Sequence, residues 1–268
     1  MGQIIKSLLH LYGENEAKSM AYRCVDLGWD CSATDILMDK PIEISEEWEA
    51  KLGRLQTGEP LQYVMGFEFF RDRKFMVSPA TLIPRPETEE LIIKILPFIK
   101  KHHRVLDVGT GSGCIAVSLG IETHASISAW DISAEALAIA QKNAAIYETK
   151  VDFQLQDIFQ WKQTSGSWDF IVSNPPYVLD SEKGEMSSNV LDFEPHVALF
   201  VPDLDPLKFY QTLGTFAWSR LNPGGWLAVE INRAYGLETE NLFRQIGFST
   251  TELHQDFKGN DRFVLAQK

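Results

Sequence analysis

From Arg104 onward the chain alternates between short apolar runs rich in β-branched residues and longer segments whose apolar residues recur every three or four positions. We predict strands at 104–108, 126–130, 151–155, 168–173, 226–231, 248–253 and 262–266, and helices at 87–96, 113–120, 133–146, 205–220 and 236–246. Such alternation is typical of an α/β fold, in which helices cover a mostly parallel sheet. Only Lys258-Gly259-Asn260-Asp261 separates the last two strands, which leaves no room for a crossover helix. The sequence therefore predicts a mostly parallel seven-stranded sheet with an antiparallel last strand.

The part of the chain before residue 60 has a helical pattern throughout. Apolar residues recur with helical spacing at 4–12, at 17–27 and, more weakly, at 45–55. Residues 1–60 therefore predict a small N-terminal helical domain. Because it contains no cluster of reactive side chains, we expect this domain to recognise the substrate.

A change of composition separates the helical region from the α/β region. Leu61–Phe70 and Lys74–Val77 are aromatic and β-branched, and a charged turn lies between them. Residues 61–84 therefore predict a β-hairpin linker, and residues 85–268 the α/β domain.

A glycine-rich loop follows the first strand of the α/β region. Its sequence is Val105-Leu106-Asp107-Val108-Gly109-Thr110-Gly111-Ser112-Gly113. Glycines allow a ligand to approach the backbone at the carboxyl end of a strand, where ligands bind in open α/β sheets. The spacing is G-x-G-x-G rather than the G-x-G-x-x-G of dinucleotide sites, so a nicotinamide cofactor is the weaker interpretation.

Two acids end the next two predicted strands. Asp131 follows the first glycine of the loop at a distance suited to accepting hydrogen bonds from both hydroxyls of a ribose. Asp157 is placed to meet an adenine amino group. Each has a simpler explanation, because Asp131 could cap the following helix and Asp157 could cap a turn.

The fourth predicted strand ends at the corner Asn174-Pro175-Pro176-Tyr177. Two prolines stop a strand, and together the Asn174 oxygen and the Pro175 carbonyl could accept both hydrogens of a planar NH2 group. A plain proline-rich turn is the alternative. The stretch from this corner to Asp203 has little periodicity, but its apolar residues favour an ordered flap over the site: Phe193, Val197, Leu199 and Phe200.

The glycine loop, Asp131, Asp157 and the corner occupy the ends of four successive predicted strands, which indicates a single site. A parallel sheet with an antiparallel last strand is the Rossmann-like architecture of the S-adenosylmethionine-dependent methyltransferases. The corner is similar to those of enzymes that methylate planar amino groups of glutamine or adenine. Further segments resemble the HemK/PrmC family: Gly58-Glu59-Pro60-Leu61-Gln62-Tyr63, Ile83-Pro84-Arg85-Pro86-Glu87-Thr88-Glu89, Phe193-Glu194-Pro195 with Ala198-Leu199, and Gly259-Asn260-Asp261-Arg262. The resemblance covers nearly the whole chain.

That family comprises the protein-(glutamine-N5) methyltransferases of peptide chain release factors. The resemblance implies S-adenosyl-L-methionine as cofactor, S-adenosyl-L-homocysteine as product, and the glutamine of the Gly-Gly-Gln loop of class I release factors as substrate. It implies cofactor contacts from Arg85, Asp107, Gly109, Thr110, Gly111, Ser112, Gly113, Asp131, Ile132, Asp157, Ile158 and Asn174. It implies that Asn174, Pro175, Pro176 and Tyr177 hold the glutamine amide, with Asn174 and Pro175 catalytic.

Two departures from the family pattern stand out. Ile158 follows the third-strand acid where some members carry Trp, and Glu230-Ile231-Asn232-Arg233 only loosely matches the expected Glu-Ile-Gly. The first leaves the packing of an adenine ring open, and the second leaves the role of that turn open.

Bulk properties bear on the alternatives. The net charge of −12 and the absence of a basic stripe count against an adenine-N6 DNA or RNA methyltransferase. A non-catalytic module that binds release factors or ribosomes would need neither Asn174 nor a full glycine loop. Cys24, Cys31 and Cys114 lack metal-ligand spacing, so we expect reduced thiols and no metal. No stretch is apolar enough to span a membrane. We therefore expect a cytoplasmic monomer with neither membrane nor nucleic acid as a partner.

Overall fold

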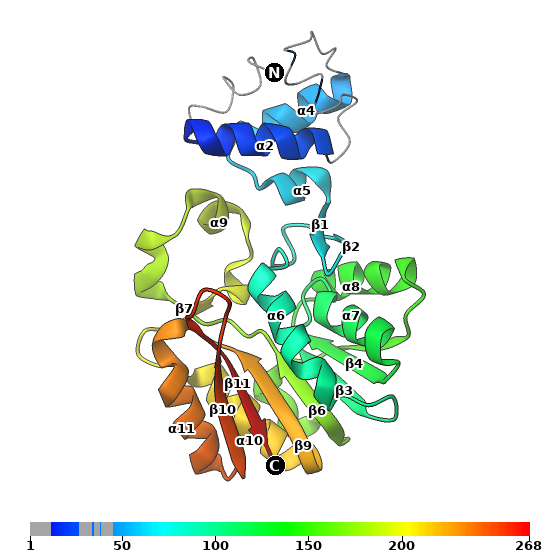
Figure 1. Ribbon diagram of the computed structural model, residues 1–268, viewed down its shortest axis with the longest axis vertical. Helices are drawn as coiled ribbons and strands as arrows, with labels where there is room; N and C mark the ends of the chain where they lie inside the picture. Colours follow the sequence, from blue (N-terminus) through cyan, green and yellow to red (C-terminus); the bar gives the residue numbers. More distant parts are fainter. Residues whose placement is uncertain (1–11, 27–33, 35–37, 39–44) are drawn as a thin grey trace. The chain divides into compact units, whose positions relative to one another are not determined.

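The computed structural model describes residues 12–26, 34, 38 and 45–268. These residues pack into two compact units (Figure 1). The first comprises Met1–Phe67 and Ser187–Phe193, and the second Glu68–Met186 and Glu194–Lys268. The first unit thus extends beyond the domain boundary expected at residue 60 and also takes in a distant segment of the chain.

Helices in the first unit bury one apolar cluster. They are α2 (Glu14–Asp26), α4 (Glu46–Leu55) and α5 (Leu61–Met65). The cluster includes Ala17, Cys24, Trp48, Leu52, Leu55, Leu61 and Val64. The helices predicted at 17–27 and 45–55 are confirmed as α2 and α4, whereas the one predicted at 4–12 lies outside the described residues except for Tyr12.

The prediction of strand at the start of 61–70 is wrong, because Leu61–Met65 is a helix. Leu61 and Val64 are both buried, and a separation of three positions places them on one helical face, whereas a strand would turn them to opposite faces. Gly66, with φ of 80°, ends the helix, and strand β1 begins only at Phe67. Helix α9 (Ser188–Phe193), which the sequence did not predict, also belongs to the first unit.

The predicted hairpin consists of β1 (Phe67–Phe70) and β2 (Arg73–Met76). Arg71 lies in its turn, and its guanidinium pairs with the Glu122 carboxylate at 2.6 Å. Arg73 reaches the same carboxylate at 2.7 Å. Glu122 belongs to helix α7 (Cys114–Thr123), so these ion pairs attach the hairpin to the α/β domain.

A buried amide also holds the end of the hairpin. Asn143, in helix α8 (Ala134–Ile146), accepts the Met76 N–H at 2.7 Å and donates to the Met76 carbonyl at 3.0 Å. The same Nδ2 donates to the Ser112 carbonyl in the glycine loop at 2.8 Å. One side chain therefore connects the hairpin, α8 and the glycine loop.

The largest sheet of the described chain has seven strands in the order β10-β11-β9-β6-β3-β4-β5. Figure 1 labels those from β10 to β4. They are β3 (Arg104–Val108), β4 (Ser126–Asp131), β5 (Val151–Leu155), β6 (Trp168–Ser173), β9 (Leu221–Glu230), β10 (Thr250–Gln255) and β11 (Asp261–Gln267). The pairs from β9 to β5 are parallel, and β11 is antiparallel to both of its neighbours. The predicted architecture is confirmed, although β9 begins at Leu221 rather than at residue 226.

Helices cover both faces of this sheet. Besides α7 and α8 they are α6 (Pro86–Ile95), α10 (Lys208–Arg220) and α11 (Gly236–Ile246). Successive residues of the central strand β3 serve opposite cores, because Val105 packs in the cluster of α6 and α7, and Leu106 in that of α10 and α11. Because the strands from β9 to β5 are parallel, their carboxyl ends lie at one edge of the sheet.

The segment after the corner contains short elements that the sequence did not predict. Strands β7 (Val178–Leu179) and β8 (Phe200–Val201) form a parallel pair. Among the described helices, none is long and apolar enough to cross a membrane.

Candidate active site

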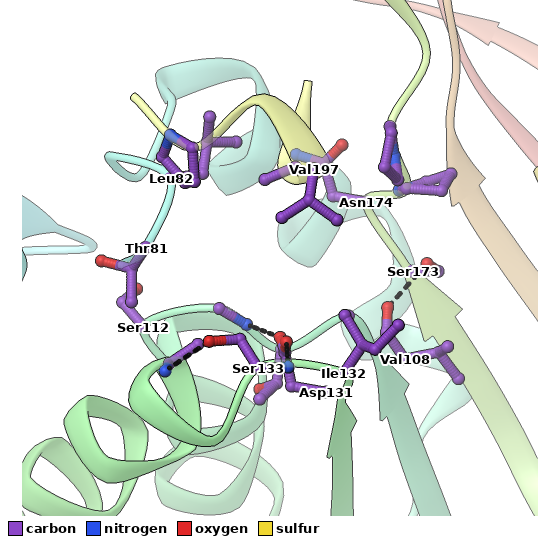
Figure 2. A pocket seen from close by; sticks show the side chains of 18 of the residues that line it. Thr81, Leu82, Val108, Ser112, Asp131, Ile132, Ser133, Ser173, Asn174 and Val197 are labelled. Atoms are coloured by element: carbon purple, nitrogen blue, oxygen red, sulfur yellow. Dashed lines mark hydrogen bonds between the residues drawn. The ribbon is translucent and has the colours of Figure 1, made fainter. Parts of the chain in front are cut away.

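A cleft of about 200 Å³ lies at the carboxyl ends of the parallel strands, entirely within the second unit. The predicted site residues that line it are Arg85, Gly109, Thr110, Gly111, Ser112, Asp131, Ile132, Asp157, Ile158, Asn174, Pro175 and Pro176. Figure 2 shows Asp131 and Ser133 on one side of the cleft and Asn174 and Val197 on the other. Asp107, Gly113 and Tyr177 do not line the cleft.

The glycine loop forms one wall mainly with backbone atoms. The N–H groups of Gly109 and Thr110 both donate to the Trp130 carbonyl, each at 2.9 Å. Gly109 and Gly111 have φ of 74° and 56°, and a Cβ on either would meet no atom of the described chain within 4 Å. This wall therefore offers an open backbone surface that a ligand can approach.

Gly113 has a packing role instead. Its φ is 79°, and a Cβ there would lie 3.0 Å from the Cβ of Ala140 in α8. The loop consequently ends where α7 and α8 are in close contact, behind the wall of the cleft.

Asp131 is 9% exposed at the end of β4. One carboxylate oxygen accepts the Gly111 N–H at 2.8 Å, and the other accepts the Ser133 N–H at 2.9 Å (Figure 2). Burial raises the pKa of Asp131, and these backbone bonds act in the opposite direction. The helix cap proposed as its alternative role is provided by Ser133. Each oxygen keeps a further lone pair, so Asp131 can still accept hydrogen bonds from a ligand.

Asp157 does cap a turn, as its alternative explanation stated, because it accepts the Phe159 N–H at 2.9 Å at the start of the 3₁₀ helix η2 (Ile158–Gln163). It also lines the cleft, as do Ile158 and Phe159. Phe159 is 40% exposed, and its ring lies 5.0 Å from that of Phe209, between centroids. Phe159, which no sequence motif indicates, supplies aromatic surface one position after Ile158.

The opposite wall contains the corner, and its side chains are held by distant residues. Asn174 Nδ2 donates to Thr88 Oγ1 at 3.0 Å, and the Thr88 hydroxyl donates to Glu230 Oε2 at 2.8 Å. The Tyr177 hydroxyl donates to Glu230 Oε1 at 2.9 Å. Thr88 and Glu230 are not among the predicted site residues. Thr88 lies in the family-like segment 83–89, and Glu230 begins the segment that departs from the family pattern.

Glu230 is fully buried at the end of β9. Burial raises its pKa, and the hydrogen bonds from Thr88 and Tyr177 counteract that rise. Two positions later, Asn232 Nδ2 donates to the Tyr177 carbonyl at 3.1 Å. Glu230 and Asn232 therefore hold Tyr177 through its hydroxyl and its backbone carbonyl. These contacts give a structural role to the segment where the sequence departs from the family pattern.

Arg85 is engaged by a carboxylate. Its Nη2 lies 2.7 Å from Oε1 of Glu194, whose side chain is 1% exposed. The other oxygen of Glu194 accepts the Ile83 N–H at 3.3 Å. Glu194 precedes the cleft-lining residues Pro195 and Val197. The ion pair between Arg85 and Glu194 therefore joins the lining segment at Arg85 to the lining segment at Pro195.

Asp107 is fully buried beneath the glycine loop. The Thr110 hydroxyl donates to its Oδ2 at 2.6 Å. Burial raises the pKa of Asp107 to about 7. Within the described ranges, no group of three or more His, Cys, Asp and Glu side chains is placed to hold a metal ion.

Comparison with known proteins gives concordant matches. Residues 87–192 match the family described as Methyltransferase small domain. A release factor glutamine methyltransferase from Bacteroides thetaiotaomicron is 45% identical, over 99% of this chain and 98% of its own length. A second protein of that name, from Flavobacterium psychrophilum, is 39% identical over 98% of this chain and 95% of its own. The crystal structure of a methyltransferase from Pyrococcus furiosus matches the fold with a TM-score of 0.54 at 19% identity, covering 72% of this chain and 87% of that one.

Proposed function

The chain belongs to the family of the release factor glutamine methyltransferases, and on that premise we propose that it methylates the side-chain amide nitrogen, N5, of the glutamine in the Gly-Gly-Gln motif of class I release factors. The observation that carries this proposal is the hydrogen bond from Asn174 Nδ2 to Thr88. Because the NH2 end of the amide donates to Thr88, the oxygen end is left to accept a hydrogen bond from a ligand in the cleft.

S-adenosylmethionine fits the wall formed by the glycine loop. The open backbone surface at Gly109 and Gly111 leaves room for a ligand, and Asp131 retains lone pairs suited to ribose hydroxyls. Asp157, Ile158 and Phe159 offer a polar edge and flat apolar surface for an adenine ring. When bound, this cofactor supplies a methyl group activated by attachment to a sulfonium.

The corner acts on the substrate amide. The Asn174 oxygen and the Pro175 carbonyl would accept the two N–H hydrogens of the glutamine side chain, turning its nitrogen towards the methyl group. An amide nitrogen is a poor nucleophile because its lone pair is delocalised into the carbonyl. Two fixed acceptors stabilise the positive charge that develops on this nitrogen during attack. Pro176 would complete the wall beside the amide, and Tyr177, held by Glu230, would support the corner from behind.

The remaining predicted site residues support these two walls. Arg85 would hold the wall through Glu194, Asp107 would fix the glycine loop through Thr110, and Gly113 would permit the close approach of α7 and α8. Ile132, which is 56% exposed, would contribute apolar contact to the cofactor.

Incubation with labelled S-adenosylmethionine and purified release factor tests the activity. Mass spectrometry should locate the label on the glutamine of the Gly-Gly-Gln peptide. A release factor with that glutamine replaced by alanine is the matched control and should stay unlabelled. Label transferred instead to adenine in DNA or RNA would contradict the proposal, as would stable binding of release factor without transfer.

We propose that the first unit recognises the body of the release factor. Residues 68–268 alone, which lack the first unit except for Ser187–Phe193, should then bind S-adenosylmethionine with unchanged affinity and methylate intact release factor poorly. Full activity of this fragment on intact release factor would contradict that role. Cys24 and Cys114 are free and buried, which is compatible with the proposed cytoplasmic location. We also propose a monomer, which sedimentation analysis would test.

A further inference from the structure

Three hydrogen bonds connect the corner to a fully buried carboxylate. They run from Asn174 to Thr88, from Thr88 to Glu230, and from Tyr177 to Glu230. Thr88 is 3% exposed, so water has little access to compete for its hydroxyl. The chain of bonds joins the carboxyl ends of β6 and β9 to the first turn of α6.

The direction of these bonds is set at Glu230. Glu230 accepts at both of its oxygens, Oε2 from the Thr88 hydroxyl and Oε1 from the Tyr177 hydroxyl. The Thr88 oxygen has then used its only hydrogen and can meet Asn174 only as an acceptor. The group that Asn174 presents to Thr88 must therefore be its NH2.

This direction matters because the two ends of an asparagine amide have nearly the same size and shape. Packing alone does not distinguish them, whereas hydrogen bonding does. A half-turn of the Asn174 amide would direct its NH2 at the substrate NH2, so that two donors face each other. The acceptor needed to orient the glutamine nitrogen would be lost.

We propose that Thr88 is a positioning residue that fixes which end of the Asn174 amide faces the cleft, and that Glu230 sets the direction of the Thr88 hydroxyl. This inference rests on the proposed methyl transfer to glutamine. It adds two residues that are distant in the sequence from their hydrogen-bond partners. Thr88 is 86 positions from Asn174, and Glu230 is 142 positions from Thr88. Thr88 lines the cleft and Glu230 does not, and we assign both a role that acts through the Asn174 amide.

The test compares Thr88→Val with Thr88→Ser by single-turnover methylation of release factor. Valine keeps the shape of threonine but has no hydroxyl, and misplacement of a reacting group can cost about 10²-fold in rate. We expect a loss of this order for Thr88→Val, unchanged affinity for S-adenosylmethionine by calorimetry, and recovery to within about threefold of wild type for Thr88→Ser. Equal rates for Thr88→Val and wild type would overturn the inference.

A matched control separates positioning from stability. Thr239 in α11 is also fully buried, but its hydroxyl has no partner among the described residues. Thr239→Val makes the same chemical change and should leave the methylation rate at the wild-type value. Thermal melting of both valine variants shows how much of any loss in rate comes from unfolding.

Two further variants examine the coupling. In Asn174→Asp the side chain has two oxygens, so no amide orientation remains to be fixed. Adding Thr88→Val to Asn174→Asp should therefore cost far less than adding it to wild type, and an equal cost in both backgrounds would overturn the inference. Glu230→Met removes both acceptors, so nothing directs the Thr88 hydroxyl away from Asn174 and methylation should slow; a wild-type rate would remove Glu230 from this role.

The wild-type measurement distinguishes failure of the inference from failure of the proposed function. If the unaltered protein does not methylate release factor, the proposed function is wrong. If it does, and Thr88→Val is equally fast, only the positioning role is wrong.

Discussion

The two walls of the cleft are stabilised in different ways. The glycine-loop wall is held by backbone N–H groups that donate to the carbonyl of Trp130 and to Asp131 in the neighbouring strand. The corner wall is held by side chains, through Thr88 and the buried Glu230. In the glycine-loop wall an added Cβ would meet open space but would strain a backbone with positive φ, whereas the corner wall can lose its function through one side-chain substitution. The glycine-loop wall should govern cofactor affinity and the corner wall turnover.

Asn174→Ala should give the largest effect and should confine it to turnover. Loss of one preorganised polar contact at developing charge costs about 10²–10³ in rate, or about 2.7–4 kcal/mol. Single-turnover methylation should fall by this amount while calorimetry shows unchanged affinity for S-adenosylmethionine. Asn174→Asp keeps an acceptor oxygen and should retain partial activity. Alanine acting at the wild-type rate would exclude the mechanism.

Asp131→Ala should have the opposite profile, weakening cofactor binding by about 1.5–3 kcal/mol, the scale of hydrogen bonds to a charged group. At saturating cofactor the methylation rate should be close to wild type. The comparison between the walls would fail if this variant bound the cofactor normally but turned over slowly.

Gly113→Ala measures the tolerance of the packing behind the glycine-loop wall. A Cβ at Gly113 would lie 3.0 Å from the Ala140 Cβ, whereas one at Gly111 would meet nothing within 4 Å. Both positions have positive φ, so Gly111→Ala is the control for backbone strain. We expect Gly113→Ala to lose about 1–3 kcal/mol more of the free energy of unfolding than Gly111→Ala, because overpacking adds to the strain. Equal losses in chemical denaturation would show that α8 yields at this contact.

Asp107→Asn should change activity least, and its effect should be on stability and depend on pH. The pKa of Asp107 is raised from an ordinary value of 3.8 to about 7 by burial, so between these values the folded state binds more protons than the unfolded chain. Its contribution to stability is present below the lower value and is lost as the pH rises to about 7. Asparagine does not titrate, so the melting temperature of the variant relative to wild type should rise between about pH 4 and pH 7. A difference that is constant with pH would show that folding does not raise the pKa of Asp107.

The walls also differ in how far the sequence predicts them. The glycine loop, Asp131 and Asp157 follow predicted strands directly, and parallel pairing brings strand ends together at one edge whatever the side chains do. The partners of the corner could not be predicted this way. Thr88 and Glu230 are 142 positions apart, and only the packing of α6 beside β9 brings them within hydrogen-bond distance.

The errors in predicting the fold have a similar cause. Leu61–Met65 is a short apolar run that suits either a strand or one helical turn, and burial of Leu61 and Val64 on one face decided for the helix. The position of the Arg85 guanidinium likewise depends on Glu194, a partner 109 positions away that local pattern does not identify.

The buried amide of Asn143 has a consequence for how the protein is made. A chain emerges from the ribosome with its amino end first, so residues 76 and 112 emerge well before residue 143. The hydrogen bonds that Asn143 makes to Met76 and Ser112 cannot form until α8 has left the ribosome. During synthesis, the hairpin and the glycine loop therefore lack these hydrogen bonds until Asn143 has emerged.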